Sequence, residues 1–385
     1  MKYIAKITTF LILWTLQINV SNAQHSKISF KDSVDHQFDL SDYIIDAHGF
    51  VPVPVIITEK ALGGFGFALA PIFLKKRKPF IEKVGDTVKV TPVAPDVTGA
   101  FGGYTANKSW FAGAFRSGTW AKPKIKYMVG GLYGNINMSF YRTLPNTNEK
   151  EFKFNIRATG AMLQATKKVS TSNWYLGLRY LFAKTDVKYR ADTTLPEFVK
   201  PLELNSILSE LGGIAEFDNR DNIFTPNNGL KFHLDGICSN EALGSDYNFW
   251  RFDYYTYIYK TLFRKLTVGL RIDGQQVVGD APFYFLPYLD MRGLPVNRYQ
   301  GKADLLSELE LRIDVFKRWS LMLYGGSGKA FDNWSDWSDT KYAWSYGTGF
   351  RYLLASKFKL RVGIDVAKGP ENWCYYIVFG SNWLK

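Results

Sequence analysis

The sequence predicts an all-β fold, a transmembrane antiparallel β-barrel of sixteen strands. Apolar and polar residues alternate with a period of two over long stretches, which is typical of strands with two different faces. Aromatic residues make up 16% of the 385 residues, yet the mean hydropathy is only −0.15. After the N-terminal 23 residues, no uncharged apolar run is long enough for a membrane helix. A lipid-facing surface would therefore have to be built from strands.

The first 23 residues have the three parts of a secretory signal peptide. Lys2 and Lys6 supply positive charge, an apolar run extends to Val20, and small residues precede the expected cleavage site. The apolar run of about 14 residues is shorter than the roughly 20 that a membrane helix needs. We therefore expect a signal peptide over 1–23, a periplasmic N-terminal segment over 24–50 and one barrel domain over 51–385.

The clearest alternation occurs in LSELELRIDVF, residues 306–316. Leu309 and Leu311 share one face of this segment, and Glu308 and Glu310 share the opposite face. The strands of a soluble sandwich usually run for about 5 to 6 residues, whereas the alternating segments here run for about 10 to 18. That length fits tilted strands that cross a membrane.

The same pattern, with Gly- and Asn-rich turns between segments, divides the chain into sixteen expected strands. This even number agrees with bacterial barrels, although fourteen remains open because the first two segments are the least regular. A short helix is expected at 41–48, where Ser41 provides a cap. The expected strands are 52–58, 62–75, 92–104, 107–119, 122–140, 150–168, 172–190, 206–219, 229–240, 246–262, 264–279, 303–316, 319–331, 342–353, 357–367 and 373–383.

Charge and cysteine content restrict the partners of the chain. The formal charge of +13 suits anionic outer-membrane lipid and lipopolysaccharide, although lysines also commonly flank lipid-facing strands. No basic recognition helix is visible in this exported chain, so we expect no nucleic-acid partner. The two cysteines, Cys238 and Cys374, are too few for a disulfide framework, and neither has ligands at metal-binding spacing.

The sequence offers no convincing catalytic group. Only one of the four histidines, His233, lies in an expected strand, where it faces inward beside Asp235. A lipid hydrolase would need Ser, His and an acid to converge near the lipid boundary, so we interpret His233 as a hydrogen-bonded lumen residue. No phosphate-binding loop or metal cluster is present. We expect no enzyme activity, no catalytic residues, no metal and no cofactor.

Four motifs occur in order along the chain: DNRDNIFTPNNG at 218–229, MRGL at 291–294, ELR at 310–312 and YYIVFGSNW at 375–383. In order and spacing they resemble the periplasmic turn, the Arg-Gly motif of the sixth extracellular loop, the twelfth strand and the closing strand of BamA/TamA-type outer-membrane barrels, the bacterial surface antigen family. The matching residues are Asp218, Arg220, Pro226 and Gly229 in the turn, Arg292 and Gly293 in the loop, Glu310 in the strand, and Phe379, Gly380 and Trp383 at the end.

The resemblance implies a bacterial outer-membrane location and a long sixth loop folded into the barrel lumen. There Arg292 would pair with Glu310, and Glu308 lies on the same inward row. A buried guanidinium without a partner costs several kcal/mol, and its planar fork can hold a carboxylate with two hydrogen bonds. The alternative is an Arg on a mobile outer loop with no fixed partner. The large apolar residues around the Arg-Gly pair favour the inserted loop.

Two departures from the family pattern bear on function. The family's thirteenth strand carries an Asp that also pairs with the loop Arg, and Gly326 stands there in this sequence. The inner contact is therefore expected to rest on Glu310 alone. In addition, the segment 24–50 is too short for one of the family's periplasmic POTRA domains. Its five Asp residues fit a small plug and a solvated periplasmic tail equally well.

Two functions fit these observations. The first is outer-membrane protein assembly or translocation, in which the seam between the segments 52–58 and 373–383 opens for a client protein, with a periplasmic partner replacing the POTRA domains. Pro52 and Pro54 would weaken that seam because they lack N–H donors. The second is a closed structural or transport barrel, a pore or a passage for lipid or solute, without insertase activity. The fold alone does not choose between them.

Overall fold

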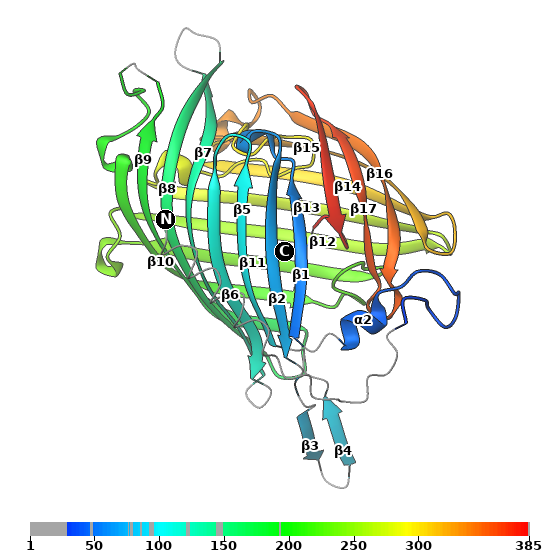
Figure 1. Ribbon diagram of the computed structural model, residues 1–385. Helices are drawn as coiled ribbons and strands as arrows, with labels where there is room; N and C mark the ends of the chain where they lie inside the picture. The colour runs from blue at the N-terminus through cyan, green and yellow to red at the C-terminus, as the bar shows by residue number, and fades with distance from the viewer. Residues whose placement is uncertain are drawn as a thin grey trace, which may run out of the picture.

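In the computed structural model, sixteen strands form one antiparallel sheet that curves into a nearly closed barrel (Figure 1). The structure describes residues 29–46, 49–75, 77, 80–84, 87–91, 96–120, 124–143, 149–191 and 194–383. The predicted signal peptide lies outside these residues. Neighbouring strands in the barrel follow the chain order, so β1 and β18 form the two edges of the sheet. The predicted fold class and strand number are confirmed.

The strands lie close to their predicted positions. No boundary differs by more than four residues: β2 and β5 begin four residues later than predicted, and β18 ends four residues earlier. The barrel strands are β1 (Gly49–Ile57), β2 (Gly66–Lys75), β5 (Asp96–Thr105), β6 (Trp110–Trp120), β7 (Ile125–Thr143), β8 (Glu149–Lys168), β9 (Trp174–Tyr189), β10 (Asn205–Asp218), β11 (Gly229–Ser239), β12 (Phe249–Phe263), β13 (Leu266–Gly279), β14 (Ala303–Asp314), β15 (Trp319–Phe331), β16 (Ala343–Ala355), β17 (Leu360–Lys368) and β18 (Trp373–Phe379).

Two elements lie outside the barrel wall. The hairpin of β3 (Phe80–Val84) and β4 (Thr87–Thr91) is a separate two-stranded sheet that projects below one end of the barrel (Figure 1). The short helix α2 (Ser41–Asp46) lies at the same end, slightly shorter than the predicted 41–48. None of the helices in the described ranges is long and apolar enough to cross a bilayer.

The barrel is apolar on its outer face and polar on its inner face. On β14, Leu309 is 48% exposed whereas its neighbours Glu308 and Glu310 are 1% and 6% exposed. On β17, Ile364 is 42% exposed and the adjacent Asp365 is fully buried. Buried carboxylates are tolerated only when cations or hydrogen-bond donors surround them. The inner wall of this barrel therefore has to be a network of ion pairs.

The two ends of the barrel differ in the length of their connections. At the end where β1 begins, which we call the turn rim, most links are short, such as 264–265, 315–318 and 356–359. At the other end, the loop rim, the links 190–204, 280–302 and 332–342 are long. Bacterial outer-membrane barrels have short periplasmic turns and longer extracellular loops, which assigns the turn rim to the periplasm.

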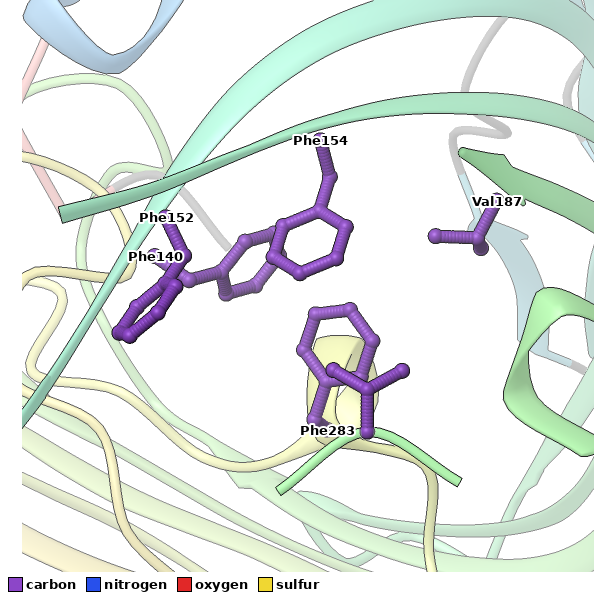
Figure 2. Close-up of a cluster of buried hydrophobic side chains, with 6 residues drawn as sticks. Phe140, Phe152, Phe154, Val187 and Phe283 are labelled. Atoms are coloured by element: carbon purple, nitrogen blue, oxygen red, sulfur yellow. The ribbon is translucent and has the colours of Figure 1, made fainter. Parts of the chain in front are cut away.

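A hydrophobic core lies inside the barrel near the loop rim. Figure 2 shows Phe140 of β7 and Phe154 of β8 pointing toward Phe283, which belongs to the connection 280–302. The ring centroids of Phe140 and Phe154 lie 4.9 and 4.8 Å from that of Phe283. Aromatic rings packed at this distance add to the hydrophobic stabilisation. This core fixes the first part of the connection 280–302 against the barrel wall.

Candidate functional site at the barrel seam

The seam between β1 and β18 is the one weak junction in the barrel wall among the described residues. Every other neighbouring pair in the sheet forms an antiparallel ladder, but no ladder joins β1 to β18 in the described part of the chain. The hydroxyl of Thr58, just after β1, donates a hydrogen bond to the carbonyl oxygen of Tyr375. If this contact sets an antiparallel register, Ile56 lies opposite Ile377, and Gly49–Val53 extends beyond the end of β18.

The closing strand ends four residues earlier than predicted. β18 stops at Phe379, and Gly380 follows with φ +75°, a left-handed conformation that glycine adopts without steric cost. The chain then turns away from the wall, and the Ser381 amide donates a hydrogen bond to the Phe224 carbonyl oxygen at 2.6 Å. This departure corrects the expected strand 373–383. It also leaves the turn-rim half of β1 without a strand opposite it.

The residues after β18 pack among inward-facing side chains. Trp383 is 2% exposed, and its ring centroid lies 5.9 and 5.8 Å from those of Tyr257 and Tyr259 on β12. Its indole Nε1 donates a hydrogen bond to Glu308 at 3.0 Å. Trp383 is therefore tied to the carboxylate row of β14 rather than to β1.

Arg292 lies in the middle of the same row. Its guanidinium is 3.4 Å from Glu308, 2.9 Å from Glu310 and 3.0 Å from Asp365, and the whole residue is 3% exposed. It also lies over the Tyr324 ring, 3.6 Å from the centroid, a geometry that favours a cation–π interaction. The expectation that Glu310 alone would hold the loop is wrong, because Glu308 and Asp365 contribute as well.

Two glycines allow the Arg-Gly loop to approach the wall closely. Gly293 has φ +90°, and a Cβ there would lie 3.1–3.3 Å from atoms of Gly369, Ser345 and Ala367. A Cβ at Gly326 of β15 would lie 2.6 Å from Glu308 Cγ and 2.8 Å from Met291 Sδ. The glycine that replaces the family's Asp therefore provides space for the residue beside Arg292, while the negative charge comes from Asp365 instead.

The Arg-Gly loop contacts both sides of the seam. The Gly293 amide donates a hydrogen bond to the Tyr376 hydroxyl of β18 at 2.9 Å, and the Val296 amide donates one to Glu59, just after β1, at 3.2 Å. A cavity of about 230 Å³ lies between these groups, and Arg292 and Trp383 also line it. The loop thus bridges the two edges of the sheet from within.

The turn motif at 218–229 is a compact hydrogen-bonded unit at the turn rim. Arg220 donates two hydrogen bonds to Asp218, both at 2.9 Å. Gly229 has φ +118° at the start of β11, and the Pro226 carbonyl oxygen accepts a hydrogen bond from Arg312 at 3.2 Å. The motif residues therefore shape this turn and anchor it to β14.

The N-terminal segment docks on the turn rim across the seam from β1. Arg318, in the β14–β15 turn, is 3% exposed and contacts Asp32, Asp35 and Asp39 at 2.7, 2.5 and 2.7 Å. The Leu40 amide also donates a hydrogen bond to the Leu354 carbonyl oxygen at the end of β16. We call residues 29–46 the acidic clamp. It contacts the β14–β15 turn, β16 and the β16–β17 turn, and β1 follows it in the chain, so together with β1 it spans the turn-rim end of the seam.

Electrostatics hold the acidic clamp in its charged form. Burial opposes ionisation of Asp39, but hydrogen bonds from Ser41 and Arg318 outweigh it and keep the pKa of this carboxyl well below its usual range. Hydrogen bonding from Arg318 likewise lowers the pKa of Asp35, and hydrogen bonding from Ser356 lowers the pKa of Asp32. The carboxylates of Asp32, Asp35 and Asp39 are therefore charged in the neutral range, where they pair with Arg318.

The other residues considered from the sequence have structural contacts. His233 is buried, with Nε2 3.5 Å from Asp235 and Nδ1 3.5 Å from Glu216, and its ring stacks on Tyr255. Both cysteines are free thiols. Within the part of the chain that the structure describes, no group of three potential ligands is arranged to hold a metal ion.

Sequence reasoning missed three parts of this site: the Asp365 partner of Arg292, the inward turn after Phe379 and the docking of the acidic clamp. Asp365 alternates with the lipid-facing Ile364 and so faces inward, but alternation does not show which loop residue it contacts. The clamp had a signal in its regularly spaced aspartates, yet its cation lies in a turn more than 270 residues away. Local patterns do not report pairs at that separation.

Comparison with known proteins agrees with this architecture. A family model described as the Omp85 superfamily domain matches residues 119–371. Among solved structures, BamA from Haemophilus ducreyi lacking POTRA domains 1–3 aligns with a TM-score of 0.55 and 12% identity, covering 86% of this chain and 69% of that one. None of the curated proteins matches this chain.

Two further structures have the same fold. CdiB from Escherichia coli aligns with a TM-score of 0.61 and 8% identity, covering 87% of this chain and 63% of that one. CdiB from Acinetobacter baumannii aligns with a TM-score of 0.51 and 11% identity, covering 86% and 58%. The chain thus spans about two thirds of the length of these structures. At such low identities the likeness concerns the barrel fold.

Proposed function

Because the chain belongs to the Omp85 superfamily, we propose that this outer-membrane barrel assists the assembly or translocation of other proteins by opening the seam between β1 and β18. The carrying observation is the interrupted wall: β1 and β18 share no ladder among the described residues, whereas every other pair of neighbouring barrel strands forms an antiparallel ladder. The proposed role depends on backbone hydrogen bonding and requires no catalytic group.

An open seam would act as a template for a client strand. The edge strands of a sheet carry unpaired N–H and C=O groups, and an extended segment of another chain can add to them. Gly49–Val53 is the best candidate, since β18 ends before it reaches these residues. Pro52 removes one donor from this stretch, so a client would pair there with fewer hydrogen bonds and could leave more readily.

Three contacts would control opening. The Arg-Gly loop joins Tyr376 to Glu59 from within, the Thr58 hydroxyl bonds to Tyr375 near the loop rim, and the acidic clamp spans the seam at the turn rim. None of these contacts is a strand ladder, so each can break without unfolding the wall. We further propose that a periplasmic partner presents the client, in the role that POTRA domains have in BamA-type proteins.

A disulfide across the seam tests this proposal. Ile56→Cys and Ile377→Cys would be combined with Cys238→Ser and Cys374→Ser, because both isoleucines are lipid-exposed and lie opposite each other in the inferred register. The matched control is Phe350→Cys with Ile364→Cys, a directly opposed and lipid-exposed pair in the continuous β16–β17 ladder. Both pairs cross-link neighbouring strands at the outer face.

The levels of other outer-membrane proteins would be measured in cells with each disulfide oxidised or reduced. We expect the seam disulfide to deplete them and the control disulfide to leave them unchanged. If a fully formed seam disulfide has no effect, the barrel does not act through lateral opening. A closed structural or transport barrel would then be the better account.

A further inference from the structure

The outer faces of β8 and β9 change from apolar to basic part of the way toward the loop rim. On β9 the outward residues Leu178 and Phe182 are followed by Lys184 and Lys188. On β8, Leu163 is 52% exposed, and Arg157 is an outward residue nearer the loop rim. The two strands are hydrogen-bonded neighbours, and Phe182 lies opposite Ala161, so the change occurs at the same level on both.

The inner face of β8 changes from polar to apolar at this level. Nearer the turn rim, β8 directs Gln164 and Thr166 inward, whereas nearer the loop rim it directs Phe152 and Phe154 into the hydrophobic core that Figure 2 shows. A transmembrane strand needs about 9 to 11 residues, but β8 has 20. The loop-rim halves of these strands therefore project beyond the hydrocarbon, with an apolar core inside and water or lipid headgroups outside.

The projecting outer surface has an excess of positive charge. Among the side chains that the structure describes, five cations and two carboxylates lie on it, which gives a net charge of +3 (5 − 2). Arg157 is 3.9 Å from Asp186, and Lys153 is 3.8 Å from Glu151, so these pairs are loose and half exposed. Lys184 and Lys188 have no carboxylate partner within the described ranges. The surface, called here the basic collar, consists of Lys153, Arg157, Lys184, Lys188 and Arg190.

Other strands carry apolar residues at the same end of their outer faces. On β12, β13 and β16 the exposed residues at the loop-rim end are apolar: Trp250, Val278 and Trp344. Lys184 is only two residues beyond Phe182, or about 7 Å along the strand at 3.3–3.4 Å per residue. The first cations of the collar thus lie just above the hydrocarbon boundary, where the headgroups of the outer leaflet are found.

We propose that the basic collar binds the phosphate groups of an anionic lipid in the outer leaflet of the outer membrane, with the lipid's acyl chains lying on the apolar surface below. Lys184 and Lys188 provide mobile point charges, and Arg157 provides a planar donor pair suited to phosphate. The apolar surface directly below the cations favours a membrane lipid over free phosphate. This inference rests on the location of the barrel and is independent of the seam.

The test compares two matched fourfold variants. The collar variant is K153Q/R157Q/K184Q/K188Q, and the control is K260Q/R264Q/K265Q/K317Q, which removes three exposed lysines and one exposed arginine near the turn rim. Retention of lipid A by the purified barrel in detergent would be followed by native mass spectrometry over a lipid A titration. Dephosphorylated lipid A serves as the second ligand, because it keeps the acyl chains and lacks the charge.

Each cation near an anionic lipid surface contributes about fivefold to binding. We therefore expect half-saturation by lipid A to rise at least tenfold in the collar variant, and to change less than twofold in the control variant. The wild-type barrel should retain dephosphorylated lipid A as weakly as the collar variant retains lipid A. Binding to the wild type should also weaken between 50 and 500 mM salt, as a screened phosphate contact does.

Equal losses in the two variants would overturn the proposal, since general charge and not the collar would then explain retention. Equal binding of lipid A and its dephosphorylated form would also overturn it. So would displacement of lipid A by free inorganic phosphate, because the collar would then bind phosphate in preference to a lipid. The heat-dependent gel mobility of each variant reports folding. If the fourfold variant does not fold, K184Q/K188Q replaces it, because removing these two lysines leaves no described carboxylate without its partner.

Discussion

Replacing Arg292 by alanine should destabilise the barrel mainly through one residue, Glu310. Glu308 keeps its ion pair with Arg271 at 2.8 Å, and Asp365 keeps two hydrogen bonds from Arg351. Glu310, 6% exposed, forms its ion pair with Arg292. Without Arg292 it is a buried carboxylate with no ion pair among the described residues, although Arg312 still attracts it. Breaking a buried ion pair by removing one partner costs about 3–5 kcal/mol, and the lost cation–π contact adds about 1 kcal/mol.

The free energy of unfolding would be measured by urea titration of the barrel in detergent, with tryptophan fluorescence as the signal. Arg292→Ala should lower the free energy of unfolding by about 4–6 kcal/mol. Adding Glu310→Gln should recover at least about 1.5 kcal/mol of that loss, because it removes the unpaired charge. Glu308→Gln in place of Glu310→Gln is the matched control, and it should recover nothing, since Glu308 retains Arg271. A loss below about 1 kcal/mol for Arg292→Ala, or equal recovery by both glutamines, would refute this reasoning.

Three further outcomes follow from the same structure. Arg318→Ala should abolish the hydrogen-exchange protection of residues 29–46. In the wild type this protection should be the same at pH 7.5 and 5.5 and should decrease only below about pH 4, because the pKa values of Asp35 and Asp39 are lowered. Gly326→Ala should lower the free energy of unfolding by about 1–3 kcal/mol because its Cβ would clash with Glu308 and Met291. Gly325→Ala should be nearly neutral, because a Cβ there would make only ordinary van der Waals contacts. Trp383→Ala should lower the free energy of unfolding by about 3 kcal/mol and make the chain around residue 383 accessible to carboxypeptidase. If the variant still resists the protease as the wild type does, the inward packing of Trp383 is contradicted.

Alternation accounts for most of what the sequence predicts correctly. In a membrane barrel each strand has one lipid face and one lumen face, so the period of two persists over the full strand and marks it clearly. This is why sixteen strands and the inward row with Glu308 and Glu310 could be read directly. The hairpin of β3 and β4 is not among the predicted strands, because its five-residue strands lie outside the wall and are too short for the long alternation that marks a barrel strand.

The chain end and the long-range partners were beyond local reasoning. The aromatic pattern of YYIVFGSNW continues to Trp383, and only the left-handed Gly380 shows that the strand has stopped. Asp365 supplies the acid expected at Gly326, because both positions lie beside the Arg-Gly loop. They are on different strands, and the sequence alone does not show how close those strands lie. Such substitutions depend on three-dimensional proximity, which alternation cannot supply.

The most direct test of the seam is a distance measured across it in a membrane. Spin labels at Ile56→Cys and Ile377→Cys, in the Cys238→Ser and Cys374→Ser background, would report the separation of β1 and β18 by pulsed electron paramagnetic resonance. Labels at Phe350→Cys and Ile364→Cys report a continuous ladder for comparison. We predict a broad distribution with a second, longer distance for the seam pair, and an increase of that population when Arg292→Ala is added. A single narrow distance, equal in width to that of the control and unchanged by Arg292→Ala, would contradict a seam that opens.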